Sequence, residues 1–427
     1  MPLNPVRQTL GNGIVVIAEE NHTTPAVSLL AVARAGGYDD PVDKEGTAAL
    51  VARVLDRGTA TRSADVIADE LDGRGASLSA SAGRHQIGVA AACLVEDLSR
   101  VMLIAADVLR SPAFPDPDVS TRRAEILTTI RQEDDDPASV AVNRFMEDVY
   151  GVHPYARRVR GTAETVGRLQ RADLVAFHER WFTPASLTVV AVGSLPAAAM
   201  VEQVASAFGD WAGNGPPRRL EVVDAAPPSA RHVERIAMPD KAQADVAYGF
   251  IGVRRLDPRY LAASVMNNAL GQYALGGRLG DSIRERQGMA YYVFSGFDAN
   301  VAEGPLVIRA GVNPANVQRA LDSIDEEVGR MARDGATAAE VSDARRYLIG
   351  SMPRTLETNG GIASFLHTAE FFGLGLDYDR RLPALLNDVT LDDVHEVART
   401  FLAPERATVI VAGPPVGETS AARESGA

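Results

Sequence analysis

The sequence predicts an α+β fold made of two tandem homologous halves. Segments with helical spacing of apolar residues alternate with short apolar runs that are typical of strands. A helix–turn–strand unit at residues 173–193 recurs at residues 393–413, with every matched position offset by 220 residues. A segment rich in Gly and Pro, residues 213–228, lies between the two copies. Such a segment is typical of a linker, so we expect an internal duplication.

The repeated unit keeps the same residue types where its elements begin and end. An aromatic residue ends each helix, Pro follows three residues later, and Gly ends each strand. The matched residues are Asp173, Trp181, Pro184, Val189 and Gly193 in the first copy, and Asp393, Phe401, Pro404, Val409 and Gly413 in the second. The alternative is that two helix–turn–strand units merely look alike.

The first half gives the order of elements in most detail. A Gly-containing turn within residues 10–17 predicts a hairpin that leads into a strand. Ser63 predicts the cap of a helix that ends at Gly73. In chain order we then expect a strand at 27–35, a helix at 46–56, strands at 76–82 and 86–93, helices at 98–109, 119–133, 139–150 and 173–181, and a strand at 187–192.

These patterns divide the chain into four predicted regions. They are an N-terminal α+β half at 1–211, a linker at 212–231, a C-terminal α+β half at 232–413 and a tail at 414–427. The tail consists of small and polar residues, so we expect it to be flexible.

Composition excludes several classes of partner. The chain has 427 residues, 46% of them hydrophobic, and a net charge of −13. This charge argues against nucleic acid, because binding to phosphates needs a basic surface. No apolar run approaches the roughly 18 residues of a membrane span, and the first residues lack the apolar core of a signal peptide. We therefore expect a cytoplasmic protein with no membrane contact; the possibility of a removed leader stays open.

Most catalytic motifs are missing. There is no G-x-S-x-G elbow, Walker loop or G-x-G-x-x-G after a strand. The single cysteine, Cys93, lies in an apolar strand and suits a structural role. Among the seven histidines the closest two are 25 positions apart, so no helix offers two His ligands one turn apart. Sequence-distant histidines could meet in space, but we expect core or surface histidines and no metal in this chain.

Three segments resemble the insulinase-like zinc peptidases, which include the mitochondrial processing peptidase. They are Gly46–Thr59 with its flanking residues, His153-Pro154-Tyr155 followed by Gly161, and the run from Ile283 to Tyr291 with Leu270-Gly271 before it. The last match is the most specific, and the resemblance spans almost the whole chain. It implies that each half is a mostly antiparallel sheet packed with helices, the processing-peptidase-like metallohydrolase fold.

The resemblance also implies a degenerate metal site. The family carries H-x-x-E-H on the helix at Gly46–Thr59, where two His hold Zn²⁺ and Glu activates its water. Here the two His positions fall on Ala49 and Arg53, and the Glu position falls on Ala52. The third ligand is a Glu from a later helix, at the position of Thr128 or Thr129. None of these five side chains suits zinc, and Arg53 places a cation there.

The remaining site residues implied by the resemblance are Arg284 and Tyr291. In the family this Tyr hydroxyl stabilises the oxyanion of the tetrahedral intermediate, and the Arg holds a substrate carbonyl. Arg284 is expected to close a helix and Tyr291 to open the next strand, with Tyr291 and Tyr292 on opposite faces. The alternative is that Arg284 is a solvated helix residue and Tyr291 a packing residue.

Together these features lead to the hypothesis of a metal-free subunit in a heterodimeric zinc metalloendopeptidase. Its partner would be a homologous subunit that carries H-x-x-E-H and the zinc, and extended peptide substrates would bind, for example along a sheet edge. On its own the chain is expected to be inactive. Two alternatives are a scaffold similar to the core subunits of the cytochrome bc complex and a homodimeric, chaperone-like peptide binder.

Overall fold

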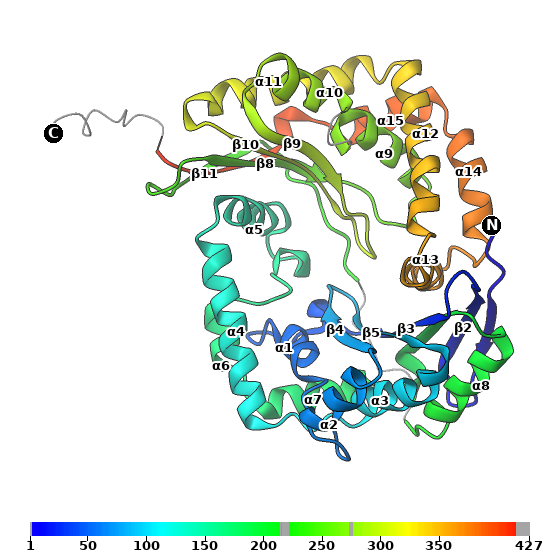
Figure 1. Ribbon diagram of the computed structural model, residues 1–427. Helices are drawn as coiled ribbons and strands as arrows, with labels where there is room; N and C mark the ends of the chain where they lie inside the picture. Colours follow the sequence, from blue (N-terminus) through cyan, green and yellow to red (C-terminus); the bar gives the residue numbers. More distant parts are fainter. Residues whose placement is uncertain (1, 214, 216–221, 273–275, 416–427) are drawn as a thin grey trace, which may run out of the picture. The chain divides into compact units, whose positions relative to one another are not determined.

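The computed structural model describes residues 2–213, 215, 222–272 and 276–415. They form two compact units, each with one β-sheet packed with helices (Figure 1). The first unit comprises residues 1–131, 157–221 and 351–382, and the second comprises 132–156, 222–350 and 383–427. The predicted α+β class is confirmed. Part of the Gly/Pro-rich segment of the predicted linker, namely residues 214 and 216–221, and the tail beyond 415 lie outside the described residues.

The sheet of the first unit has six strands. A short hairpin, β1 and β2, forms one edge, as the sequence predicts. β2 pairs with β6 in parallel, and every other pair in this sheet is antiparallel. In spatial order the strands are β1 (Val6–Thr9), β2 (Val15–Glu20), β6 (Leu187–Gly193), β3 (Ala26–Ala33), β5 (Ile87–Leu94) and β4 (Ser77–Ala82).

The sheet of the second unit repeats this arrangement without the first strand. One pair, β7 with β11, is parallel and the rest are antiparallel. In spatial order the strands are β7 (His232–Ala237), β11 (Thr408–Gly413), β8 (Ala244–Ile251), β10 (Pro305–Val312) and β9 (Ala290–Phe297). Helix α7 (Arg171–Trp181) and helix α15 (Leu391–Phe401) have bounds offset by the same 220 residues as the sequence repeat. The two homologous halves are therefore present in the fold.

The first unit buries one large apolar core between its sheet and its helices. Val16, Leu29 and Val89 come from the strands, Ile14 comes from the residue just before β2, and Leu50 comes from the first helix. Because successive strand residues face opposite sides, the sheet offers this core every second residue. The helices that begin in this unit within the first half of the sequence are α1 (Thr47–Val54), α2 (Ala64–Asp72), α3 (Leu98–Arg110), α4 (Asp116–Asp134), α6 (Ala163–Arg168), α7 and α8 (Ala197–Phe208).

The second unit contains most of the remaining helices. They are α5 (Pro137–Tyr150), α9 (Tyr260–Asn267), α10 (Gly277–Leu279), α11 (Val317–Asp334), most of α12 (Ala338–Thr355), part of α14 (Tyr378–Asp388) and α15. Two π-helical segments, η5 (Asn268–Gln272) and η6 (Gly280–Arg286), accompany them. Such segments are rare and often occur near functional residues.

Each compact unit contains one helix whose residues belong to the other half of the sequence. Helix α5 precedes the linker but packs on β8 and β11 of the second sheet, whereas α13 (Asn359–Phe371) packs on β3 and β6 of the first (Figure 1). The helix caps are similar, because the side chains of Asp136 and Thr358 each accept a bond from a backbone N–H three residues on. The predicted boundaries at 1–211 and 232–413 divide the chain by its sequence repeat. The compact units instead group the residues that contact one another in space.

Side-chain packing explains why these two helices take those places. Ile362, Ala363 and Leu366 of α13 share a buried cluster with Val190 and Val192 of β6. On the second sheet, Phe145 of α5 is fully buried against Gly249 of β8, where an added Cβ would lie 3.0 Å from the Phe145 ring. Because glycine has no Cβ, this position of β8 leaves space for the aromatic ring.

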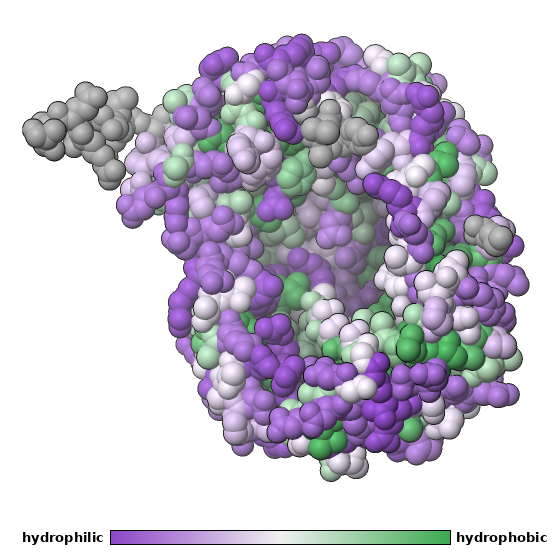
Figure 2. Space-filling model, viewed as in Figure 1, coloured by the Kyte–Doolittle hydropathy of each residue, from purple (hydrophilic) through white to green (hydrophobic). Residues whose placement is uncertain are grey.

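The surface is polar over much of the face in Figure 2. Hydrophilic residues dominate around α10 and α11, and the hydrophobic residues form separate patches. None of the helices that the structure describes is long and apolar enough to cross a membrane.

Candidate functional site

The helix that aligns with the family's zinc motif is anchored by a buried carboxylate. Asp40 accepts hydrogen bonds from the backbone N–H groups of Gly46 (2.7 Å) and Ala48 (2.8 Å), at the start of α1. A carboxylate there satisfies donors that have no partner within the helix. Along α1, Ala49 is half-buried, Ala52 is buried and Arg53 is exposed. The helix is therefore well formed even though its motif residues are changed.

Arg53 joins a cluster of charged groups with helix α4. Its guanidinium lies 3.2 Å from a carboxylate oxygen of Glu125, which also accepts a bond from Arg122 at 2.6 Å. The hydrogen bond from Arg122, with a smaller contribution from Arg53, lowers the pKa of Glu125. Thr128 and Thr129 donate to the carbonyls of residues 124 and 125 in their own helix. The structure thus brings Arg53 to α4, where one carboxylate balances two arginines.

Arg284 and Tyr291 lie where the sequence predicts them, at the end of η6 and at the second position of β9. The turn between them is fixed by Gly288, whose φ of 62° favours glycine. Its N–H donates to the Arg284 carbonyl at 3.0 Å, and the N–H of Met289 donates to the carbonyl of Ile283 at 3.1 Å. These bonds close the last helical turn and set the direction of the strand.

The side chains of Arg284 and Tyr291 have few partners. Tyr291 is 85% exposed, and its hydroxyl has no hydrogen bond among the described residues. The Arg284 side chain is 39% exposed, and its nearest described charge is Glu285 at 3.9 Å. Both donors are therefore available to a ligand. No other described group fixes their relative position.

The neighbouring tyrosine has a structural role instead. Tyr292 faces the opposite side of β9 and donates its hydroxyl to Asp245, at 2.5 Å. Asp245 is almost fully buried and also accepts a bond from Gln243 at 3.0 Å. Burial raises the pKa of Asp245, and the two hydrogen bonds oppose this shift. The predicted division of the two tyrosines between opposite faces is confirmed.

The His-Pro-Tyr segment is part of the packing of the second unit. His153 Nε2 lies 2.9 Å from the carbonyl of Val223, and its Nδ1 accepts a bond from the N–H of Tyr155 at 3.0 Å. The Tyr155 hydroxyl accepts a bond from the N–H of Ala302. These contacts fix a loop, and no free ligand atom of His153 remains.

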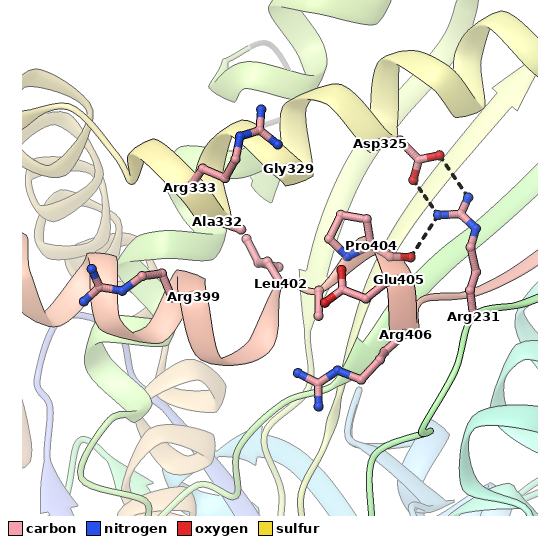
Figure 3. Close-up of a pocket in the computed structure, with 11 residues that line it drawn as sticks. Arg231, Asp325, Gly329, Ala332, Arg333, Arg399, Leu402, Pro404, Glu405 and Arg406 are labelled. Carbon is pink, nitrogen blue, oxygen red and sulfur yellow. Dashed lines mark hydrogen bonds and ion pairs between the residues drawn. The ribbon is translucent and has the colours of Figure 1, made fainter.

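A cavity of about 620 Å³ lies in the second unit at the ends of α11 and α15 (Figure 3). Arg231 donates two hydrogen bonds to Asp325, at 2.7 and 2.9 Å, and a third to the carbonyl of Pro404. The hydroxyl of Tyr248 also donates to Asp325. These groups are hydrogen-bonded to one another, so this part of the cavity wall has a structural role and connects the start of strand β7 to helix α11.

Sequence reasoning missed a second cluster of charged side chains. Asp148, at the end of α5, faces His232 and Glu234 at the start of β7. Within the described ranges this is the one group of three metal-ligating side chains found together. Its signal in the sequence is the alternate spacing of His232 and Glu234, which places both on one face of a strand. No sequence pattern indicates that His232 and Glu234 lie beside residue 148.

Comparison with known proteins covers nearly the whole chain. Residues 15–163 match the family model described as insulinase (peptidase family M16), and residues 168–348 match the model described as peptidase M16 inactive domain. A Mycobacterium tuberculosis protein named as an uncharacterized zinc protease is 31% identical over 420 residues, covering 96% of this chain and 94% of the relative. A Helicobacter pylori protein named as a non-peptidase homolog is 24% identical, covering 90% and 88%.

A solved structure matches over almost its full length. The crystal structure of a peptidase M16 inactive domain from Pseudomonas fluorescens superposes with a TM-score of 0.91, at 25% identity, covering 98% of this chain and 99% of the other. Relatives with a zinc-protease name and one with a non-peptidase name thus both resemble this sequence.

Proposed function

Since this chain belongs to the insulinase-like peptidase family M16, we propose that it is the subunit of a heterodimeric zinc endopeptidase that holds no catalytic metal at its own degenerate motif. In this proposal a homologous subunit with an intact H-x-x-E-H motif supplies the zinc, which activates the attacking water. This chain supplies Arg284 and Tyr291 to substrate and transition state in the partner's site.

The observation that carries the proposal is the contrast between the two sets of family positions. At the metal positions, Ala49, Ala52 and Arg53 offer no ligand, and Arg53 is paired with Glu125. At the transition-state positions, Arg284 and Tyr291 keep the family's spacing and their polar ends are available. A solvent-exposed tyrosine without a hydrogen bond contributes little to folding, which supports a role in binding.

The chemistry assigned to each residue follows from its functional group. A phenol hydroxyl donates one hydrogen bond and can stabilise the negative charge that develops on a carbonyl oxygen during attack by water. A guanidinium offers several donors in a fixed fork, so Arg284 would hold a neighbouring peptide carbonyl and orient the chain. Neither residue transfers a proton in this scheme.

The test compares Tyr291→Phe with Tyr292→Phe in the complex of this chain and the H-x-x-E-H homologue from the same genome. We expect the lone chain to be inert and the pair to cleave peptides. Tyr291→Phe should lower kcat about 100- to 1,000-fold, as for loss of one oxyanion donor, with unchanged assembly. The control variant Tyr292→Phe removes a hydroxyl that faces Asp245, so its kcat should be unchanged. Full activity of the Tyr291→Phe complex would refute the role of this hydroxyl.

A second candidate function is a peptide-binding or scaffold protein without any catalytic partner. The relative named as a non-peptidase homolog favours it. A homodimer or single chain that binds extended peptide, together with inactivity of every pairing with an H-x-x-E-H homologue, would support this second function over the first.

A further inference from the structure

Three potential metal ligands converge where helix α5 meets the edge strand β7. His232 Nε2 lies 3.1 Å from Asp148 Oδ2 and 3.8 Å from Glu234 Oε2. One ligand atom from each of the three residues lies within 4.8 Å of the others. Atoms that bind one Zn²⁺ at about 2.1 Å in tetrahedral geometry are about 3.4 Å apart. The observed spacing is therefore close to that of a formed site.

Asp148 provides a second, independent observation. Its Oδ2 atom is buried and has no hydrogen-bond partner among the described residues. The contact with His232 Nε2 has the distance of an ion pair, but it is not aligned as a hydrogen bond. A buried carboxylate oxygen without a partner is costly. This oxygen and His232 Nε2 face each other at 3.1 Å, which is close to the separation of two atoms that bind the same metal ion.

Arg144 holds both carboxylates from one side. Its Nε donates to Glu234 Oε2 at 2.7 Å and lies 3.0 Å from Asp148 Oδ1. Asp148 is thereby oriented through Oδ1, while Oδ2 points toward His232. Groups that orient metal ligands in this way are a common part of metal sites.

The local charge favours a cation. Two carboxylates and one guanidinium leave a net negative charge while His232 is neutral. Asp148 lies in the last turn of α5, where the helix dipole disfavours an anion and favours a cation.

We propose that Asp148, His232 and Glu234 bind one divalent transition-metal ion of the zinc class, which fastens α5 to β7. The imidazole ligand selects zinc or cobalt over calcium and magnesium, which take oxygen ligands. All three residues belong to the second unit. None of the three residues is one of the family's metal positions Ala49, Ala52 and Arg53, and the role of the ion is structural.

The experiment is a cobalt titration of the untagged full-length chain after dialysis against a chelator. Co²⁺ is the probe because its visible absorption reports ligand type and coordination geometry. We expect one equivalent of Co²⁺ to bind with intense visible bands, to be displaced by Zn²⁺, and to raise the melting temperature. His232→Gln should weaken binding at least about 100-fold and remove the increase in melting temperature.

The matched control is His22→Gln. His22 is exposed and faces a single carboxylate, with its Nε2 3.5 Å from Glu20, so this variant should bind Co²⁺ as the parent does. Asp148→Asn is a second variant that removes the charge but keeps the shape. Absence of Co²⁺ binding to the folded parent chain, or binding that survives both His232→Gln and Asp148→Asn, would overturn the proposal.

This test is independent of the proposed peptidase role. Its readout is metal binding by the lone chain, whereas the peptidase role is read from cleavage by the pair. A lone chain that binds cobalt and cleaves nothing fits both proposals.

Discussion

At the scale of single residues, two adjacent tyrosines have opposite surroundings. Tyr291 is exposed, whereas Tyr292 donates to the buried Asp245. We expect Tyr292→Phe to lower the free energy of unfolding by about 1–3 kcal/mol, because it removes a partner of a buried carboxylate. Tyr291→Phe should change it by less than about 0.5 kcal/mol. Denaturant unfolding of both variants measures this difference, and equal losses would contradict it.

Two nearby arginines allow a similar comparison for substrate binding. Arg284 has no close described partner, whereas Arg286 lies 3.0 Å from Asp281 and is 61% exposed. In the two-subunit complex, Arg284→Ala should lower kcat/KM at least about tenfold, since it removes a charged donor to substrate. Arg286→Ala should leave kcat/KM within a factor of two, as expected for an exposed ion pair. Steady-state kinetics with a peptide substrate measures kcat/KM for both variants and provides this comparison.

At the scale of elements, helix α13 carries a buried histidine. His367 stacks near Phe371, and Arg34 and Glu370 are the charged groups that act on it. Burial lowers the pKa of His367 to about 4, and the positive charge of Arg34 adds to this shift. The folded state therefore holds the neutral ring, while the unfolded chain takes up a proton near pH 6.5.

The sign of the resulting pH dependence follows from linkage. The contribution of the neutral ring to the free energy of unfolding is fully present above pH 6.5. It is lost as the pH falls toward 4, and the loss amounts to up to about 3 kcal/mol. His367→Phe removes the titrating group and should flatten this part of the stability profile. Unfolding measured from pH 7 to pH 4 provides the comparison, and parallel profiles for parent and His367→Phe would refute the assignment.

At the scale of the whole molecule, the exchange of α5 and α13 makes the two halves dependent on each other. Residues 1–213 lack α13, and residues 222–427 lack α5. We expect each fragment expressed alone to be insoluble or molten, because Ile17, Val190 and Phe145 lose their partners. Co-expressed fragments should form a soluble pair with cooperative melting. Independent folding of either fragment, judged by near-UV circular dichroism, would contradict this.

The sequence predicts the fold better than it predicts the sites. The repeat at 173–193 and 393–413 marks the duplication because both copies keep the residues that begin and end the same elements. The exchange of helices cannot be predicted in this way, since nothing in the residue patterns of α5 and α13 indicates which sheet each helix covers. The predicted places of Arg284 and Tyr291 depend on a local turn, and they agree with the structure.

Sites made from distant residues escape sequence reasoning for a physical reason. Asp148 and His232 are brought together only when α5 packs on the second sheet. The roles of Arg284, Tyr291, Ala49, Ala52, Arg53, Thr128 and Thr129 stay predictions, because they would be exercised only in the proposed complex with a second subunit.

The late position of α13 in the chain also has a consequence for biosynthesis. The ribosome completes every strand of the first sheet by residue 193, yet α13 is translated only at residues 359–371. During this interval Val190, Val192 and Ile17, which α13 covers in the finished protein, have no permanent cover. The nascent chain thus presents an apolar sheet face for more than 150 residues of synthesis, which makes it a natural client for chaperones that act at the ribosome.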